Sequence, residues 1–261
     1  DEIADVFAEW NQGELDSYLM EITSEICRRK EADGSWLLEH ILDAAGQKGT
    51  GKLTVAAALD ESDPLTLIAE AVNARFLSAI RDERIQAASL YKKEKAVPQT
   101  TVPTETLRHA LYASKLISYA QGFSLHYGWN LDLGMLARIW RKGCIIRSVF
   151  LGQITRAYEV APSLENLLFD DFFRARIQEA LPAWRQVAAI AITTGIAAPC
   201  MVSGLAYFDG LCTTNSSANI IQAQRDYFGA HTYERIDAPR GQFFHTDWNE
   251  TGGSASRTYN V

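Results

Sequence analysis

The chain has 261 residues, of which 47% are hydrophobic and 22% are charged, and its formal net charge is −7. This composition and length are those of a globular protein with a sizeable buried core. The negative charge argues against nucleic acid as a partner, because such a site needs clustered Lys and Arg, but it leaves room for a local anion site. The most apolar stretch spans 12 residues, 187–198, which is too short to cross a membrane. We therefore expect a buried helix there and no membrane partner.

Apolar residues recur at intervals of three and four along nearly the whole chain, a pattern typical of helices that bury one face. After two short helices at the start, we expect longer helices over 64–91, 104–127, 131–158, 164–179 and 182–197. The basic stretch 92–103 contains prolines and predicts a loop. The fold class predicted is therefore all-α, with a large multi-helix domain over 1–215 and an extended, mostly non-helical C-terminal tail over 216–261.

The segment 46–52, GQKGTGK, is the first candidate site. It nearly matches the Walker A pattern, but Leu53 stands where that pattern requires Ser or Thr, and the preceding residues 38–45 look helical rather than strand-like. The glycines still let backbone N–H groups approach an anion, while Lys48 and Thr50 offer a positive charge and a hydroxyl donor. From composition alone, a plain surface loop is an equal alternative.

Arg75 borders the apolar face of the helix expected over 64–91. An arginine in this position either extends to the surface or pairs with a carboxylate such as Asp82, Glu70 or Asp43. The third possibility is bidentate recognition of a phosphate, for which the planar guanidinium is well suited.

The cysteines and histidines do not indicate a metal site. The four cysteines, Cys27, Cys144, Cys200 and Cys212, lack metal-ligand spacing, and we expect them to be reduced. The histidines show no H-x3-H pairing and no cysteine partner. No G-x-G-x-x-G lies between a strand and a helix, so cofactor-binding residues stay unknown.

The segment 222–235 places Arg225 and His231 within a run of aromatic residues. Such a run is too aromatic for a free tail and predicts docking against another surface. The alternative is packing on its own domain, with both side chains in solvent.

Four blocks resemble the decarboxylating 6-phosphogluconate dehydrogenase family. Residues 45–52 resemble its glycine-rich substrate loop, 70–87 the helix after it, and 139–148 a block in the helical domain. Residues 222–234 resemble its signature tail, and the blocks keep the family's order. The resemblance identifies the C-terminal helical domain and tail without the N-terminal coenzyme domain. Because the chain opens at Asp1 inside a helical pattern, we expect it to be an excised fragment.

The resemblance implies a cytoplasmic, NADP-linked enzyme of the pentose phosphate pathway. It converts 6-phosphogluconate to ribulose 5-phosphate and carbon dioxide and needs no metal. In the family a lysine serves as general base and a glutamate as general acid. Both precede the matched region, so this chain is expected to supply no catalytic residue and to lack turnover by itself. NADP is expected to bind mainly to the N-terminal domain.

Carried over by position, the resemblance assigns the substrate phosphate to Lys48, Thr50 and Arg75. Arg225 and His231 should complete that site in the neighbouring subunit of a homodimer that exchanges its tails. The alternative is a helical dimerisation module that binds no ligand. A more distant alternative is a β-hydroxyacid dehydrogenase for another acid, against which the tail segment argues.

Overall fold

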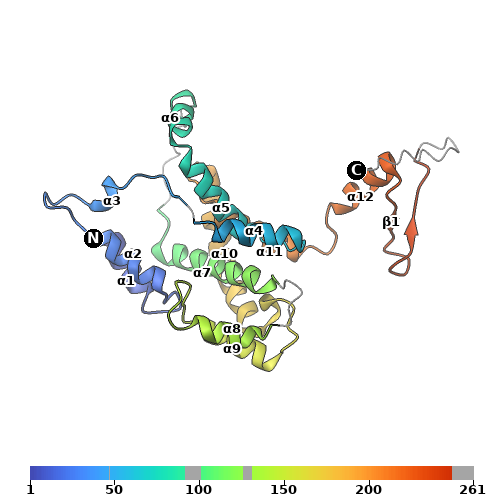
Figure 1. The fold of residues 1–261 in the computed structure, drawn as a ribbon, viewed down its shortest axis with the longest axis horizontal. Coiled ribbons are helices and arrows are strands. Elements are labelled where there is room, and N and C mark those ends of the chain that lie inside the picture. The colour runs from blue at the N-terminus through green and yellow to red at the C-terminus, as the bar shows by residue number, and fades with distance from the viewer. Residues whose placement is uncertain (47, 92–100, 126–130, 249–261) are drawn as a thin grey trace. The chain divides into compact units, whose positions relative to one another are not determined.

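The computed structural model describes residues 1–46, 48–91, 101–125 and 131–248. The chain folds as two compact units, Asp1–Phe208 and Asp209–Val261. The described part of the first unit is helical (Figure 1), with α1 Glu2–Trp10, α2 Tyr18–Arg28, α3 Leu37–His40, α4 Thr50–Asp60, α5 Thr66–Ala79, α6 Arg81–Leu90, α7 Thr104–Ser124, α8 Leu133–Trp140, α9 Leu151–Val160 and α10 Asp171–Thr193. A short 3-10 turn at Leu167–Phe169 precedes α10, and α11 spans Pro199–Leu211. The all-α fold class is confirmed.

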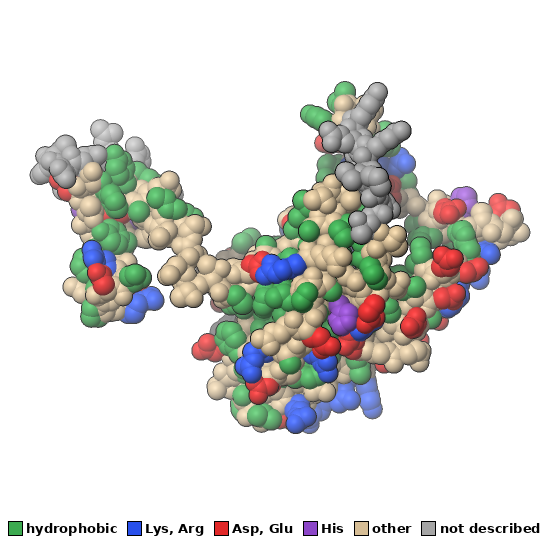
Figure 2. All heavy atoms as spheres, turned by 180° about the vertical axis from the view of Figure 1, so that it is seen from behind, with side chains coloured by type: hydrophobic (Ala, Val, Ile, Leu, Met, Phe, Trp, Pro, Cys, Tyr) green, Lys and Arg blue, Asp and Glu red, His purple; other side chains and the backbone are tan. Residues whose placement is uncertain are grey.

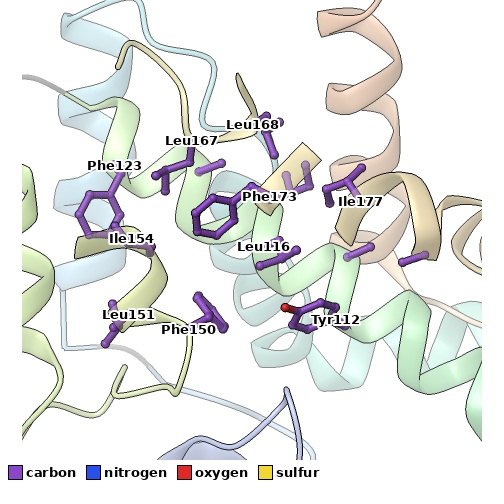
Figure 3. Close-up of a cluster of buried hydrophobic side chains, with 14 of the residues drawn as sticks. Tyr112, Leu116, Phe123, Phe150, Leu151, Ile154, Leu167, Leu168, Phe173 and Ile177 are labelled. Atoms are coloured by element: carbon purple, nitrogen blue, oxygen red, sulfur yellow. The ribbon is translucent and has the colours of Figure 1, made fainter. Parts of the chain in front are cut away.

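The core of the first unit is built around α7 and α10, which pack along each other. Figure 3 shows part of it, where side chains from α7, α9, the 3-10 turn and α10 converge: Tyr112, Leu116, Phe123, Phe150, Leu151, Ile154, Leu167, Leu168, Phe173 and Ile177. Trp184 of α10 is fully buried, and its indole Nε1 donates to the Met201 carbonyl at 3.0 Å. Deep burial of large apolar side chains makes these two helices the stable base of the unit.

A buried glutamine attaches α5 to this core. The Gln121 side chain of α7 is 0% exposed, and its Oε1 accepts from the Leu67 backbone N–H at 3.0 Å. Its Nε2 donates to Thr66 Oγ1, also at 3.0 Å. Both contacts satisfy groups at the first turn of α5, where backbone N–H groups have no partner within the helix. The start of α5 is therefore fixed on α7.

Several expected helix boundaries were wrong. The helix expected over 64–91 divides at Ile80 into α5 and α6, and the helix over 131–158 divides into α8 and α9. Conversely, the two helices expected on either side of Pro182 form one helix, α10, with this proline inside it. The proline removes one backbone donor, but its position is exposed and the packed residues on either side keep the helix together.

The segment that joins α8 and α9 is held by main-chain bonds to the turn after α1. The Tyr18 N–H donates to the Arg147 carbonyl at 3.3 Å, and the Val149 N–H donates to the Asp16 carbonyl at 3.0 Å. These partners are more than a hundred residues apart in the sequence, so periodicity could not reveal them. They explain why a helical pattern is interrupted at this point.

Four further expectations have different outcomes. The segment 38–45 contains only the last residues of the one-turn helix α3, and 41–46 is not helical. In the apolar stretch 187–198, Val187, Ala188 and Ala191 are buried as expected, but Ile192 and Ile196 are exposed. The loop expected over 92–103 and the end of the helix expected at 127 lie largely outside the described residues.

The second unit is mostly non-helical in its described part, as expected. It contains a helix, α12, over Ala218–Gly229 and a short antiparallel pair of strands, β1 Tyr233–Glu234 and β2 Phe243–Phe244. The expectation of a mostly non-helical segment after residue 215 is confirmed for the described residues, and α12, which includes Arg225, is the helical part of that segment. No helix within the described ranges is long and apolar enough to span a membrane.

Candidate functional site

Lys48, Thr50 and Arg75 line one hollow in the first unit. Its volume is about 540 Å³, and Gly46, Gly49 and Gly51 complete the lining. The loop supplies Lys48, the first turn of α4 supplies Thr50, and α5 supplies Arg75. The structure therefore brings together the three residues of this unit that the sequence singled out.

The N-terminus of α4 opens onto this hollow. Gly49 caps the helix with a φ of 103°, a left-handed conformation that a residue with a Cβ rarely adopts. The first bond within the helix runs from the Leu53 N–H to the Gly49 carbonyl, and no side chain caps the turn. The N–H groups of this first turn and the positive end of the helix dipole are a suitable partner for an anion.

Gly51 has a different role, the close approach of α4 to α5. A Cβ at this position would lie 2.9 Å from Val72 Cγ2, which is closer than Cβ atoms come in folded proteins. The glycine therefore allows Thr50 on α4 and Arg75 on α5 to face the same hollow.

Arg75 contacts the glycine-rich loop rather than a carboxylate. Its Nη2 donates to the Gly46 carbonyl, and Ser78 Oγ donates to the Arg75 carbonyl at 2.7 Å. The same hydroxyl accepts from the Ala45 N–H at 2.9 Å. These contacts join the loop to the C-terminal half of α5 and hold the guanidinium at the edge of the hollow.

Asp43, one of the expected partners of Arg75, instead binds two other arginines. Its carboxylate lies 3.1 Å from Arg81 Nε and 3.0 Å from Arg84 Nη1. Hydrogen bonds from Arg84 and Arg81 lower the pKa of Asp43 below its ordinary value. Among the described residues, no ion pair joins Lys48 or Arg75 to a carboxylate. Their charge remains available to an anion in the hollow.

Arg225 and His231 belong to the second unit. Arg225 lies on the exposed side of α12, and its Nη1 donates to Gln222 Oε1 at 3.0 Å. His231 follows the helix and is also exposed, with its ring 6.0 Å from the Phe228 ring. These two candidates lie on one folded unit, separate from the unit that carries Lys48, Thr50 and Arg75.

The sequence interpretation missed the residues that support these candidates. In the first unit, Ser78 links the loop to α5. In the second unit, Asp226 is fully buried although it directly follows the exposed Arg225. The sequence signal for Asp226 was its place as a carboxylate within an aromatic run. A carboxylate that is buried among such residues requires hydrogen-bond partners and so holds them in place.

No described residues form a cluster that could hold a metal ion. The four cysteines are free, with Cys212 exposed and the others partly exposed.

Comparison with known proteins places this geometry in a family. Residues 1–248 match the family described as "6-phosphogluconate dehydrogenase, C-terminal domain". The chain belongs to this family. It is 51% identical to the decarboxylating 6-phosphogluconate dehydrogenase of Aggregatibacter actinomycetemcomitans over 100% of the chain and 56% of the relative. It is 50% identical to the enzyme of Ovis aries, with the same coverage.

A solved structure agrees with this assignment. The 6-phosphogluconate dehydrogenase of Plasmodium falciparum, studied in its apo form and in complex with NADP+ and with 6-phosphogluconate, superposes with a TM-score of 0.89. It is 39% identical in sequence, and the match covers 94% of this chain and 55% of that protein. The chain spans about half the length of the curated relatives it matches.

Proposed function

We propose that the chain is the substrate-binding part of an NADP-dependent, decarboxylating 6-phosphogluconate dehydrogenase. This cytoplasmic enzyme would oxidise 6-phosphogluconate to ribulose 5-phosphate and carbon dioxide in the pentose phosphate pathway. The observation that carries the proposal is the convergence of Lys48, Thr50 and Arg75 on one hollow, in a chain that belongs to this family.

The hollow suits a phosphate dianion in charge and in hydrogen-bond donors. The first turn of α4 offers N–H groups, Thr50 a hydroxyl donor and Lys48 a mobile ammonium group. Arg75 offers a planar fork of donors, and its contact with the Gly46 carbonyl orients this fork in advance. Charge-assisted hydrogen bonds of this kind distinguish a phosphorylated sugar acid from the unphosphorylated one.

We propose that Arg225 and His231 of a second copy complete the site in a homodimer with exchanged tails. Both side chains are exposed, and they lie on a different compact unit from the one that contains the hollow. The first unit also exposes large apolar side chains on α4, α5 and α6, including Leu53, Leu59, Phe76, Leu77, Ile85 and Leu90. In Figure 2, apolar and charged side chains of both signs share the visible face. Exposed apolar surface of this extent is typical of docking surfaces.

The described residues do not fit NADP. They form no strand followed by a glycine-rich turn and a helix, which is the usual support for a dinucleotide pyrophosphate. NADP accepts the hydride in the proposed reaction, and we assign its binding to residues outside this chain. The general base and general acid are assigned there too. The role that we propose for Lys48, Thr50 and Arg75 is therefore to bind and orient the substrate.

Calorimetry of the 261-residue chain with 6-phosphogluconate at low salt tests the proposal, with the oligomeric state measured by light scattering. We expect a dimer whose affinity falls about 10- to 100-fold in Arg75→Ala and in Arg225→Ala, as for loss of a charge-assisted hydrogen bond. Arg138→Ala and Arg235→Ala are matched controls, because these arginines are exposed and each pairs with a neighbouring carboxylate.

Each outcome has a definite meaning. A monomer, or binding that does not depend on Arg225, would contradict the shared site. A dimer that binds no 6-phosphogluconate would favour the second candidate function, a dimerisation module without a ligand. The exposed apolar side chains of α4–α6 are the observation that supports this candidate.

A further inference from the structure

One buried carboxylate organises the second unit. The Asp226 side chain is 0% exposed. Its Oδ1 accepts from the Thr232 backbone N–H at 3.0 Å and lies 2.9 Å from His245 Nδ1. Its Oδ2 accepts from the Thr246 backbone N–H at 3.1 Å and from Trp248 Nε1 at 2.9 Å. Four donors from two separate segments therefore meet on one side chain of α12.

The four contacts keep this carboxylate charged. Burial by itself raises the pKa of Asp226, but the hydrogen bonds from His245, Thr246 and Trp248 outweigh burial, and the pKa lies below its ordinary value. A buried charge with complete hydrogen bonding holds its partners in defined positions, because every displacement leaves a donor or the carboxylate without a partner.

One of these contacts fixes the turn that carries His231. Ala230 and Thr232, on either side of this histidine, have φ values of 49° and 58°. Left-handed backbone is unfavourable for residues with a Cβ, so the surrounding contacts must hold it in place. The Thr232 N–H is held by Asp226, and the Thr232 carbonyl accepts from Gln222 Nε2 at 2.5 Å.

The same turn places the imidazole of His231 against a glycine. A Cβ on Gly229 would lie 2.7 Å from both Cδ2 and Nε2 of the His231 ring. A side chain at position 229 would displace the ring, while the contacts of Asp226 would remain.

Arg225 is connected to the same turn. The Gln222 side chain accepts from Arg225 Nη1 with its oxygen and donates to the Thr232 carbonyl with its nitrogen. Arg225 and His231 are therefore held on a common support.

We propose that Asp226 is a positioning residue that presets Arg225 and His231 as a pair for a phosphate group. This inference rests on the proposed function, because the proposed function supplies the phosphate that Arg225 and His231 would bind. Asp226 itself does not touch the ligand, and it acts through the turn at 230–232 and through Gln222.

The test compares three variants of the 261-residue chain. Asp226→Asn leaves one acceptor oxygen for four donors. Gly229→Ala displaces the His231 ring and leaves that carboxylate intact. Asp237→Asn is the matched control, because this aspartate is exposed and pairs with Arg235 in the same unit.

Calorimetry measures the binding of 6-phosphogluconate and of gluconate, which lacks the phosphate. We expect Asp226→Asn and Gly229→Ala each to weaken 6-phosphogluconate binding about tenfold, the scale expected for misplaced ligand-binding groups. Gluconate binding should not change, and Asp237→Asn should bind both ligands as the unchanged chain does. NMR contacts between the His231 ring and Gly229 should disappear in Asp226→Asn, while the melting of the first unit stays the same.

The outcomes separate the inference from the proposed function. If the unchanged chain does not bind 6-phosphogluconate, the proposed function fails and the positioning role fails with it. If the unchanged chain binds and Asp226→Asn binds equally well, only the positioning role is overturned. It is also overturned if Asp226→Asn weakens binding but Gly229→Ala does not, because the placement of the His231 ring would then be irrelevant.

Discussion

The two groups of proposed phosphate ligands are supported in different ways. In the first unit, the glycine-rich loop lies on α4 and α5, and α5 is fixed on the apolar core through Gln121. The aspartate beside the loop, Asp43, has a side chain that is 64% exposed. In the second unit, Asp226 is 0% exposed, and no hydrophobic side chain among residues 209–248 is buried to a similar degree.

This difference shows that a ligand-binding segment can be fixed by packing on a buried apolar core or by the hydrogen bonds of one buried carboxylate. Exposed ion pairs such as those of Asp43 contribute little, so the loop depends on the helices beneath it. The small second unit buries no large apolar side chain in its described part, so it depends on the hydrogen bonds of one carboxylate. The two regions should therefore respond to different perturbations.

Removing a large side chain from the apolar core of the first unit should have the largest effect on stability. Trp184→Ala should lower the free energy of unfolding of the first unit by about 3–5 kcal/mol, because it leaves a cavity in the core. It also removes the hydrogen bond to the Met201 carbonyl. Urea unfolding followed by circular dichroism measures this, with Ile192→Ala as an exposed control on the same helix. Similar losses in both variants would show that the first unit does not depend on this core.

Low pH should destabilise the second unit, because it protonates Asp226. Its pKa in the folded unit lies below the ordinary value of 3.8, so its stabilisation is present above that pH and is lost as the pH falls through the folded pKa. Hydrogen bonds to a carboxylate contribute about 1.5–3 kcal/mol, so we expect the protection of the Thr232 and Thr246 amides to fall by roughly that amount. Hydrogen exchange measured from neutral pH into this range tests the prediction.

Asp226→Asn should remove this acid transition, whereas Asp237→Asn should retain it. A transition that persists in Asp226→Asn would assign the acid sensitivity to another group.

Closing the space between α4 and α5 should have a smaller effect. Gly51→Ala should cost about 1–3 kcal/mol through overpacking against Val72. The second substitution Val72→Ala should recover part of this loss, since the two side chains would be in direct contact. Thermal melting measures both changes. Gly122→Ala on α7 is the control, because a Cβ there meets nothing within 4 Å and the change should not destabilise the unit. A Gly51→Ala chain as stable as the control would refute the close approach.

Salt should produce the smallest difference. Raising the salt concentration to about 1 M screens exposed charges. We expect the protection of the Ala45 amide, beside the ion pairs of Asp43, to fall by a few tenths of a kcal/mol. The Thr246 amide, which is bound to the buried Asp226, should not change. Hydrogen exchange at low and high salt compares the two amides. An equal loss of protection at both would show that the exposed ion pairs of Asp43 and the buried contacts of Asp226 do not differ in their sensitivity to salt.

Helical periodicity predicted the fold class but not all the helix ends. It correctly indicated that 104–124 and the residues around Trp184 are helical, because strong apolar faces there pack on each other. It failed at Ile80 and within 141–150, because the apolar pattern continues across both breaks. Within 141–150 the break coincides with backbone contacts to distant residues. It also treated Ile192 as buried, since a pattern shows which residues are apolar but not which of them find a partner.

The sequence by itself determined the family and the all-α class, because these depend on short blocks of residues in a recognisable order and on helical periodicity. The five ligands that it singled out remain a prediction. Only the tertiary structure decided that Asp43 binds Arg81 and Arg84 rather than Arg75. It also decided that Asp226, which no pattern singled out, is the centre of the second unit. Both results depend on groups that are separated in the sequence, by 38 and 41 residues for Asp43 and by 6 to 22 residues for Asp226. Folding brings such groups together, and burial then determines how strongly they interact.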